Sequence, residues 1–186
     1  MARVISRDDV PWALEFEEAG CAFRSHVERV ERAERRFLLD AGAPIPAVAL
    51  LPDLVVESYE VETTYFASPA HGVLRLRRYR ATGGMWLEQK YREDEALVKT
   101  RMEVIRFSEP PSVRVVAAVS YERTAYEDGA TRITVDRDIR SSGRAFPSCV
   151  LEVKGRGVPE LEAALPPQAV GFSKYRWARS IHRAPA

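Results

Sequence analysis

The stretch VLRLRRYR, residues 73–80, alternates arginine with leucine. Successive side chains of a β-strand point to opposite faces, so Arg75 and Arg77 share one face and Leu74 and Leu76 share the other. A half-buried strand with one solvated face explains a single pattern of this kind. Arginines gathered on one face can also bind phosphate through charge-assisted hydrogen bonds. Recurrence of the pattern in other strands therefore decides between an ordinary half-buried strand and a phosphate-binding face.

The same alternation returns in most of the strand-like segments that follow. The residues that share a face are Glu88, Lys90 and Arg92 in MWLEQKYRE, Lys99 and Arg101 in VKTRME, Tyr121 and Arg123 in YERTAY, Arg132, Thr134 and Asp136 in TRITVD, and Glu152 and Lys154 in VLEVK. Solvated faces usually mix Ser, Thr, Lys, Glu and Gln, whereas Arg and Lys dominate these positions. An open sheet with one wet face remains the alternative, but this composition favours a basic surface that faces inward.

A basic interior has a chemical consequence. Like charges that converge inside a barrel repel one another unless an anion is bound, and phosphate is the leading candidate. Phosphates bring divalent cations with them, which Glu88 and Glu152 could hold through carboxylate oxygens. Glu88 could equally neutralise a neighbouring cation such as Lys90. Glu34 is in phase with Arg36, and a salt bridge is the simpler explanation for it.

Strands must position these side chains. Between about Val55 and Val153 the sequence reads as many short strands, separated by turn residues such as Gly83-Gly84 and Pro110-Pro111. Asp128-Gly129 is the strongest single hairpin signal. A series of short strands of this kind predicts an antiparallel sheet or barrel.

Helices are predicted at both ends of the chain. Over residues 8–35, Pro11 suits a first turn and apolar residues recur near helical spacing, with Gly20 as an interruption. The segment VPELEAAL, residues 158–165, predicts a short helix near the other end. The predicted fold class is α+β: an antiparallel β-barrel with an N-terminal helix and short C-terminal helices.

Composition excludes several classes of protein. A length of 186 residues suits one domain, and a net charge of +1 argues against a nucleic-acid-binding protein with a broad basic exterior. Cys21 and Cys149 stand far apart without metal-ligand spacing, so neither a zinc site nor a disulfide framework is predicted. The sequence contains no signal peptide and no membrane-spanning run, so a reduced, cytoplasmic protein is expected.

An ordered series of short motifs resembles a known family. The motifs are RAERRF (32–37), TTYF (63–66), LRLRRY (74–79), WLEQK (86–90), VKTR (98–101), YERTAY (121–126), TRITVD (131–136), VLEVK (150–154) and FSKY (172–175). In this order they resemble the VTC domain of polyphosphate polymerases, a member of the CYTH-like triphosphate tunnel metalloenzymes. The resemblance implies a tunnel domain over residues 32–180, an N-terminal helical extension over 1–31 and a tail over 181–186.

The resemblance also implies a site. It implies a tunnel barrel that binds triphosphate or polyphosphate, with Mn²⁺ or Mg²⁺ on the inward carboxylate of Glu152. The implied catalytic residues are Arg75, Arg77, Lys90, Lys154 and Lys174. The implied substrate-binding residues are Arg36, Lys99, Arg101, Tyr121, Arg123, Arg132 and Ser173. A rim position is the alternative for Arg101. Arg36 stands where the family commonly has lysine, and Ala67 replaces the usual aspartate.

Three functions follow from the resemblance. The leading one is a polyphosphate polymerase that transfers the terminal phosphoryl group of ATP to a polyphosphate or pyrophosphate primer. The first alternative is a metal-dependent hydrolase of tripolyphosphate or nucleoside triphosphates, since the sequence does not separate water from phosphate as nucleophile. The second alternative is a binding protein that senses polyphosphate or nucleotide without turnover.

Overall fold

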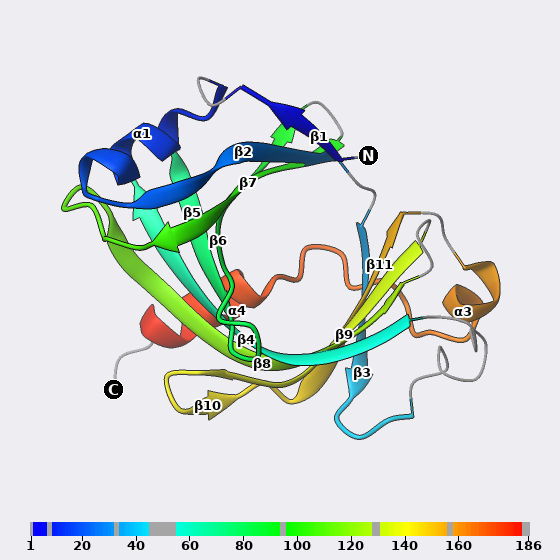
Figure 1. Cartoon of the computed structure of the whole chain (residues 1–186). Coiled ribbons are helices and arrows are strands. Elements are labelled where there is room, and N and C mark those ends of the chain that lie inside the picture. Colours follow the sequence, from blue (N-terminus) through cyan, green and yellow to red (C-terminus); the bar gives the residue numbers. More distant parts are fainter. Residues whose placement is uncertain are drawn as a thin grey trace.

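One curved antiparallel sheet makes up most of the molecule (Figure 1). The computed structural model describes residues 2–6, 9–31, 34–44, 55–93, 96–127, 131–155 and 158–183. The strands are β1 (Ala2–Ile5), β2 (Ala22–Glu31), β3 (Glu34–Asp40), β4 (Val55–Ser68), β5 (Gly72–Tyr79), β6 (Met85–Glu93), β7 (Ala96–Arg106), β8 (Arg114–Glu127), β9 (Thr131–Ser141), β10 (Arg144–Ala145) and β11 (Ser148–Gly155), and the helices are α1 (Pro11–Glu18), α3 (Pro159–Ala163) and α4 (Lys174–Arg183). The sheet order is β1-β2-β7-β6-β5-β4-β8-β9-β11-β3, and β10 pairs with β9.

The sheet curves strongly but does not close. Within the described ranges, the two outer strands β1 and β3 each pair on one side only, β1 with β2 and β3 with β11. A closed barrel requires a hydrogen-bonded partner on both sides of every strand. The predicted antiparallel sheet and terminal helices are therefore present, whereas the predicted closed barrel is wrong. The pattern of alternation gives the face of each side chain and carries no information on whether the two edges meet.

The predicted helix over residues 8–35 is mostly a strand. Among the described residues of this range, the α-helix is limited to α1; Gly20, in the left-handed region with φ of 98°, follows it, and β2 begins at Ala22. The pairing of β2 with β7 shifts register between Phe23 and Val27, and both side chains are buried on the same side. Phe23 and Val27 are four residues apart, a spacing that puts two side chains on one face of a strand and also on one face of a helix. The prediction failed because this spacing does not distinguish the two structures.

The predicted strands and the predicted short C-terminal helix are confirmed in the described residues. Strands occupy most of the described chain between Val55 and Val153, and β8 pairs with β9 as the hairpin prediction requires. The Asp128-Gly129 turn itself lies outside the described residues. Helix α3 lies within the predicted segment 158–165. None of the described helices is both long and apolar enough to cross a membrane.

The two faces of the sheet have different coverings. Trp12 and Phe16 of α1 pack on the face that carries Leu74, Leu76 and other buried apolar residues. Each fully buried side chain of this size contributes about 1.5–3 kcal/mol of hydrophobic free energy. The leucines of the 73–80 stretch therefore form a core beneath α1, which leaves the arginines between them on the opposite, concave face.

Helix α4 covers part of that concave face. Ala178 of α4 is fully buried and belongs to one apolar cluster with Val61 of β4, Val119 of β8 and Val150 of β11. Lys174, the first residue of α4, is buried at the border between this apolar region and the charged remainder of the face. The helix therefore limits the charged surface at one end and contributes a cation to it.

Candidate functional site

The strand register places the predicted basic residues on one face. On one side of the sheet, Arg75 of β5 lies opposite Glu88 of β6, and Lys90 of β6 lies opposite Lys99 of β7. Because side chains alternate along each strand, Arg77 lies on the same face. Five charged side chains from three neighbouring strands thus line a continuous surface.

The same face continues through the other side of the sheet. Cross-strand partners there are Arg123 of β8 with Asp136 of β9, Arg132 of β9 with Lys154 of β11, and Glu152 of β11 with Arg36 of β3. Alternation puts Tyr121 on this face as well, and α4 adds Lys174. The predicted site residues that lie on strands therefore come from seven strands, β3, β5, β6, β7, β8, β9 and β11, and Lys174 comes from α4. Their carboxylates and cations form two groups.

The first group, the Glu88 cluster, consists of Glu88, Arg75, Arg77 and Lys99. Glu88 is completely buried, and its Oε2 lies 2.5 Å from Arg75 Nε and 3.9 Å from Arg77 Nη1. Its Oε1 lies 3.4 Å from Lys99 Nζ. Burial alone would raise the pKa of Glu88, but Arg75, Lys99 and Arg77 hold it well below its usual range. One ionised carboxylate therefore serves three cations.

Lys90 and Lys99 lose part of their basicity in this setting. Burial, together with the positive charge of Arg75, lowers the pKa of Lys90 to about 7. Burial also lowers the pKa of Lys99 well below its usual range, despite the attraction of Glu88. The Lys90 side chain keeps 28% of its surface exposed, so a ligand on the concave face can reach it. A bound anion would restore the charge on both lysines.

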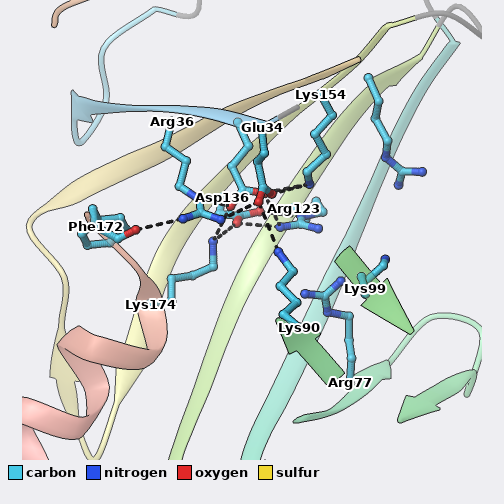
Figure 2. A network of polar contacts seen from close by, with 12 residues as sticks. Glu34, Arg36, Arg77, Lys90, Lys99, Arg123, Asp136, Lys154, Phe172 and Lys174 are labelled. Carbon is cyan, nitrogen blue, oxygen red and sulfur yellow. Dashed lines mark hydrogen bonds and ion pairs between the residues drawn. The ribbon is translucent and has the colours of Figure 1, made fainter. Parts of the chain in front are cut away.

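The second group, the Glu152 cluster, holds three carboxylates. Its members are Glu34, Asp136 and Glu152 with Arg36, Lys90, Arg123, Lys154 and Lys174, most of which Figure 2 shows pointing toward one another. Arg36 joins two of the carboxylates, with Nε 2.9 Å from Glu152 Oε1 and Nη2 2.6 Å from Glu34 Oε2. Lys154 joins the same pair at 2.7 Å from Glu152 Oε2 and 3.6 Å from Glu34 Oε1. Two carboxylates therefore share two cations.

Asp136 is the third carboxylate of the cluster. Arg123 donates to it through two nitrogens, at 2.6 and 2.8 Å, and Lys174 Nζ lies 2.5 Å from Asp136 Oδ2. Burial opposes ionisation, but Arg123 and Lys174 lower the pKa of Asp136. Lys174 Nζ also lies 3.8 Å from Glu152 Oε1. The contacts of Lys174 with Asp136 and Glu152 fix the start of α4 to the sheet. Asp136 orients both Arg123 and Lys174.

The donor chemistry of Glu34 and Glu152 fits one divalent cation. Mg²⁺ and Mn²⁺ prefer oxygen ligands, and Mg²⁺ is commonly held by one or two carboxylates together with substrate phosphates. Glu34 Oε1 is buried and accepts no hydrogen bond, and Lys154 Nζ lies between the two carboxylates. No set of three His, Cys, Asp or Glu residues within the described ranges is arranged to hold a metal ion. A cation here would therefore depend on two protein ligands and the substrate.

Two predicted site residues, Arg132 and Arg101, have partners outside the Glu152 cluster. Arg132 Nη1 lies 3.1 Å from Glu127 Oε2, and its Nη2 donates to Tyr59 Oη at 3.1 Å. The Arg101 guanidinium lies over the Trp86 ring, 4.5 Å from its centroid. These contacts separate Arg132 and Arg101 from the carboxylates of the Glu152 cluster.

Ser173 and Tyr121 sit beside Lys174. Ser173 Oγ accepts the backbone N–H of Arg176 at 3.1 Å, which caps the first turn of α4. The Tyr121 ring packs 5.3 Å from the Arg123 guanidinium carbon and 5.1 Å from Lys174 Nζ. Burial would raise the pKa of Tyr121, but the positive charges of Arg77 and Arg123 lower it. Both residues shape the surroundings of Lys174.

Two residues of the site had no assigned role in the sequence prediction. Asp136 appeared only as a member of a strand face, although its position two and four residues after Thr134 and Arg132 placed it with them. Glu34 appeared only as a salt-bridge partner, and it does contact Arg36, but it also contacts Lys90 and Lys154. The side chain of Arg92 lies outside the described residues.

Positive charge exceeds negative charge across the two clusters. The cations are Arg36, Arg75, Arg77, Lys90, Lys99, Arg123, Lys154 and Lys174, and the carboxylates are Glu34, Glu88, Asp136 and Glu152. Eight cations against four carboxylates leave a surplus even when Lys90 and Lys99 are neutral. A buried surplus of one sign is costly unless a ligand of opposite charge binds. The concave face is therefore suited to a polyanion.

Comparisons with known proteins identify the fold. No known family profile and no curated protein matches the sequence. Among solved structures, a Hippeastrum protein described as an adenylyl cyclase with a dominant triphosphatase activity matches with a TM-score of 0.59 at 17% identity, covering 84% of this chain and 98% of that one. A Bacillus halodurans protein described as an adenylate cyclase matches with a TM-score of 0.52 at 14% identity, covering 85% and 94%.

The fold also occurs in a different setting. A chain of the Schizosaccharomyces pombe Mediator head module matches with a TM-score of 0.50 at 10% identity, covering 82% of this chain and 91% of that one. At these identities the likeness concerns the fold, and fold alone does not determine function. The chain thus shares its fold with these solved structures, and the family that the sequence resembles stays a prediction.

Proposed function

We propose that this protein binds a triphosphate along the concave face of its sheet and hydrolyses it in a reaction that depends on a divalent cation. The observation that carries the proposal is the surplus of cations over carboxylates on that one face. The fold shared with the Hippeastrum protein, whose description names a dominant triphosphatase activity, supports hydrolysis as the reaction. Arg75, Arg77 and Lys99 would bind phosphate oxygens, and Glu34 and Glu152 would hold the cation.

Phosphoryl transfer requires little covalent chemistry from the protein. Positioning of the reactants and neutralisation of charge on the equatorial oxygens account for most of the catalysis. A water oxygen forms the new bond to the terminal phosphorus and gives up a proton, the bridging P–O bond breaks, and the leaving pyrophosphate or nucleoside diphosphate keeps the electron pair of that bond. When bound, a divalent cation supplies further charge neutralisation. Lys90 and Lys154 would stabilise developing charge, while Lys174 and Arg123 would fix the end of the phosphate chain.

Transfer to a phosphate primer is the second candidate. The ordered motifs from RAERRF (32–37) to FSKY (172–175) favour it, because they resemble polyphosphate polymerases. In this reaction an oxygen of pyrophosphate or polyphosphate replaces water as the nucleophile, and ATP is the donor. The binding surface and the proposed roles of Arg75, Arg77, Lys90, Lys154 and Lys174 stay the same.

One experiment separates the candidates. Purified protein is incubated with Mg²⁺ or Mn²⁺ and either tripolyphosphate or ATP with pyrophosphate, and free phosphate and polyphosphate are measured in the same sample. Free phosphate without polymer supports the hydrolase, and a polymer ladder supports the polymerase. Binding without turnover under either metal would overturn both and support a sensor.

A matched pair of variants tests the site. Lys90→Ala removes a cation from the concave face, and we expect turnover to fall about 10²–10³-fold, the usual loss for a donor to developing charge. Arg80→Ala removes an exposed arginine that pairs with Glu60 and Glu62 outside the site, and it should stay near wild type. Equal turnover in the two variants, with circular dichroism confirming the fold of each, would contradict the proposed site.

A further inference from the structure

Trp86 is an aromatic side chain on a face that otherwise carries many charges. It is half-buried on β6 and lies directly opposite Arg77 of β5 in the strand register. The guanidinium of Arg101, from β7, lies over its ring, 4.5 Å from the centroid. Arg101 is in turn the cross-strand partner of Glu88. The stacked pair of Trp86 and Arg101 therefore adjoins the Glu88 cluster.

An indole and a guanidinium plane are the surfaces on which nucleobases stack. Proteins hold unpaired bases on aromatic rings and on arginine planes, because every base has a π-face. A strand rises about 3.3 Å per residue, so Glu88 lies roughly 7 Å and Lys90 roughly 13 Å along β6 from Trp86. The aromatic platform therefore lies at one end of the charged face of β6, and the phosphate-binding cations lie along the rest of that face.

We propose that Trp86 and Arg101 form a stacking platform for the base of a nucleoside triphosphate whose phosphates lie on the Glu88 cluster. The proposal rests on the proposed function, since it assumes that the concave face binds phosphates. It adds that the protein distinguishes a nucleotide from an inorganic triphosphate, and that this distinction comes from Trp86 and Arg101. A simple cation–π pair with a structural role would not make that distinction.

The test compares two ligands in binding rather than in turnover. Isothermal calorimetry with EDTA present gives the Kd of ATP and of tripolyphosphate for each protein. Base stacking on an aromatic side chain is worth about 1–3 kcal/mol, which corresponds to roughly 5–150-fold in affinity. We therefore expect Trp86→Ala to raise the ratio of the ATP Kd to the tripolyphosphate Kd at least about fivefold. Trp86→Phe keeps an aromatic face and should raise the ratio less.

Two further variants keep the result interpretable. Arg101→Lys retains the charge but loses the planar surface, so the same ratio should rise, and this holds even if Trp86→Ala fails to fold. Trp177→Phe, in α4 and packed on Phe146, is the control for loss of an indole elsewhere and should leave the ratio unchanged. An unchanged ratio in both Trp86→Ala and Arg101→Lys would overturn the platform while leaving the phosphate site intact. Wild-type protein that binds neither ligand would overturn the proposed function as well.

Discussion

The Glu88 cluster and the Glu152 cluster lie on the same concave face but distribute charge differently. In the first, one fully buried carboxylate faces three cations. In the second, Glu34 and Glu152 share Arg36 and Lys154, and Asp136 binds Arg123 and Lys174, which also approach Glu152. One buried oxygen of Glu34 accepts no hydrogen bond and is available to a divalent cation, whereas both oxygens of Glu88 accept hydrogen bonds from cations. The comparison suggests that the Glu88 cluster binds phosphate and the Glu152 cluster assists its transfer.

Loss of the single carboxylate should have the largest effect. Glu88→Gln removes the counter-charge of the buried Arg77 and of the partly buried Arg75 and Lys99, and removal of one partner from a buried ion cluster costs about 3–5 kcal/mol of unfolding free energy. Urea denaturation measures this loss. Added tripolyphosphate should raise the melting temperature of the variant more than that of wild type, because the ligand replaces the missing charge.

Glu34→Gln is the matched control for that prediction. Of its three cations, Arg36 and Lys154 keep Glu152 as a partner and Lys90 is partly exposed, so the loss in unfolding free energy should be clearly smaller than for Glu88→Gln. Equal destabilisation by the two variants would mean that the clusters do not differ in the way proposed.

Loss of the central carboxylate of the other cluster should affect turnover instead. Glu152→Gln removes a proposed metal ligand, and we expect the turnover number to fall about 10²–10³-fold together with its dependence on Mn²⁺ or Mg²⁺. Affinity for tripolyphosphate in EDTA should be retained or increased, because the surplus of positive charge grows. Glu127→Gln, at a partly exposed carboxylate paired with Arg132, serves as the control. Unaltered metal activation in Glu152→Gln would contradict this role.

Removal of a cation from the Glu88 cluster should weaken binding first. Arg75→Ala is expected to raise the Kd of tripolyphosphate in EDTA roughly 10–100-fold, since hydrogen bonds to charged groups are worth about 1.5–3 kcal/mol. Calorimetry measures the change directly. A Kd within about twofold of wild type, with turnover lost, would reverse the roles assigned to the two clusters.

Lys90 joins the clusters and should make binding depend on pH. Its pKa of about 7 means that the free protein holds Lys90 charged below that pH and neutral above it. A bound polyanion favours the charged form, so binding above pH 7 takes up a proton and affinity falls as the pH rises, by at most about tenfold per pH unit. Lys90→Arg is always charged and should flatten this part of the profile. Profiles of identical shape in wild type and Lys90→Arg would exclude Lys90 as the group responsible.

The smallest effect is expected at the start of α4. Ser173→Ala removes the side-chain acceptor for the N–H of Arg176, and loss of an N-cap costs about 1 kcal/mol of stability. If the cap is its main role, the Kd of tripolyphosphate should change little while the melting temperature falls. A large rise in Kd with an unchanged melting temperature would instead support direct phosphate contact by Ser173.

The shared face of the Glu88 cluster was the feature of the site that the sequence predicted most directly. Arg75 and Arg77 alternate with apolar residues along one unbulged strand, so their shared face follows from the period of two alone. The same reasoning failed for residues 22–31, where Phe23 and Val27 stand four apart, a spacing that a strand and a helix share. Sequence reasoning therefore worked where basic and apolar residues alternate strictly and failed where the apolar spacing suited both structures.

Sequence alone determined the strand-rich fold, the faces of the basic residues and the kind of ligand they suit, because these depend on local alternation and side-chain chemistry. Only the tertiary structure decided which partners meet, since Arg36 and Glu152 are 116 residues apart and Lys174 and Asp136 are 38 apart. It also decided that the described strands leave the sheet open at β1 and β3. Contacts over such distances, and the closure of a sheet, depend on how strands pair across the whole chain, and no local pattern encodes them.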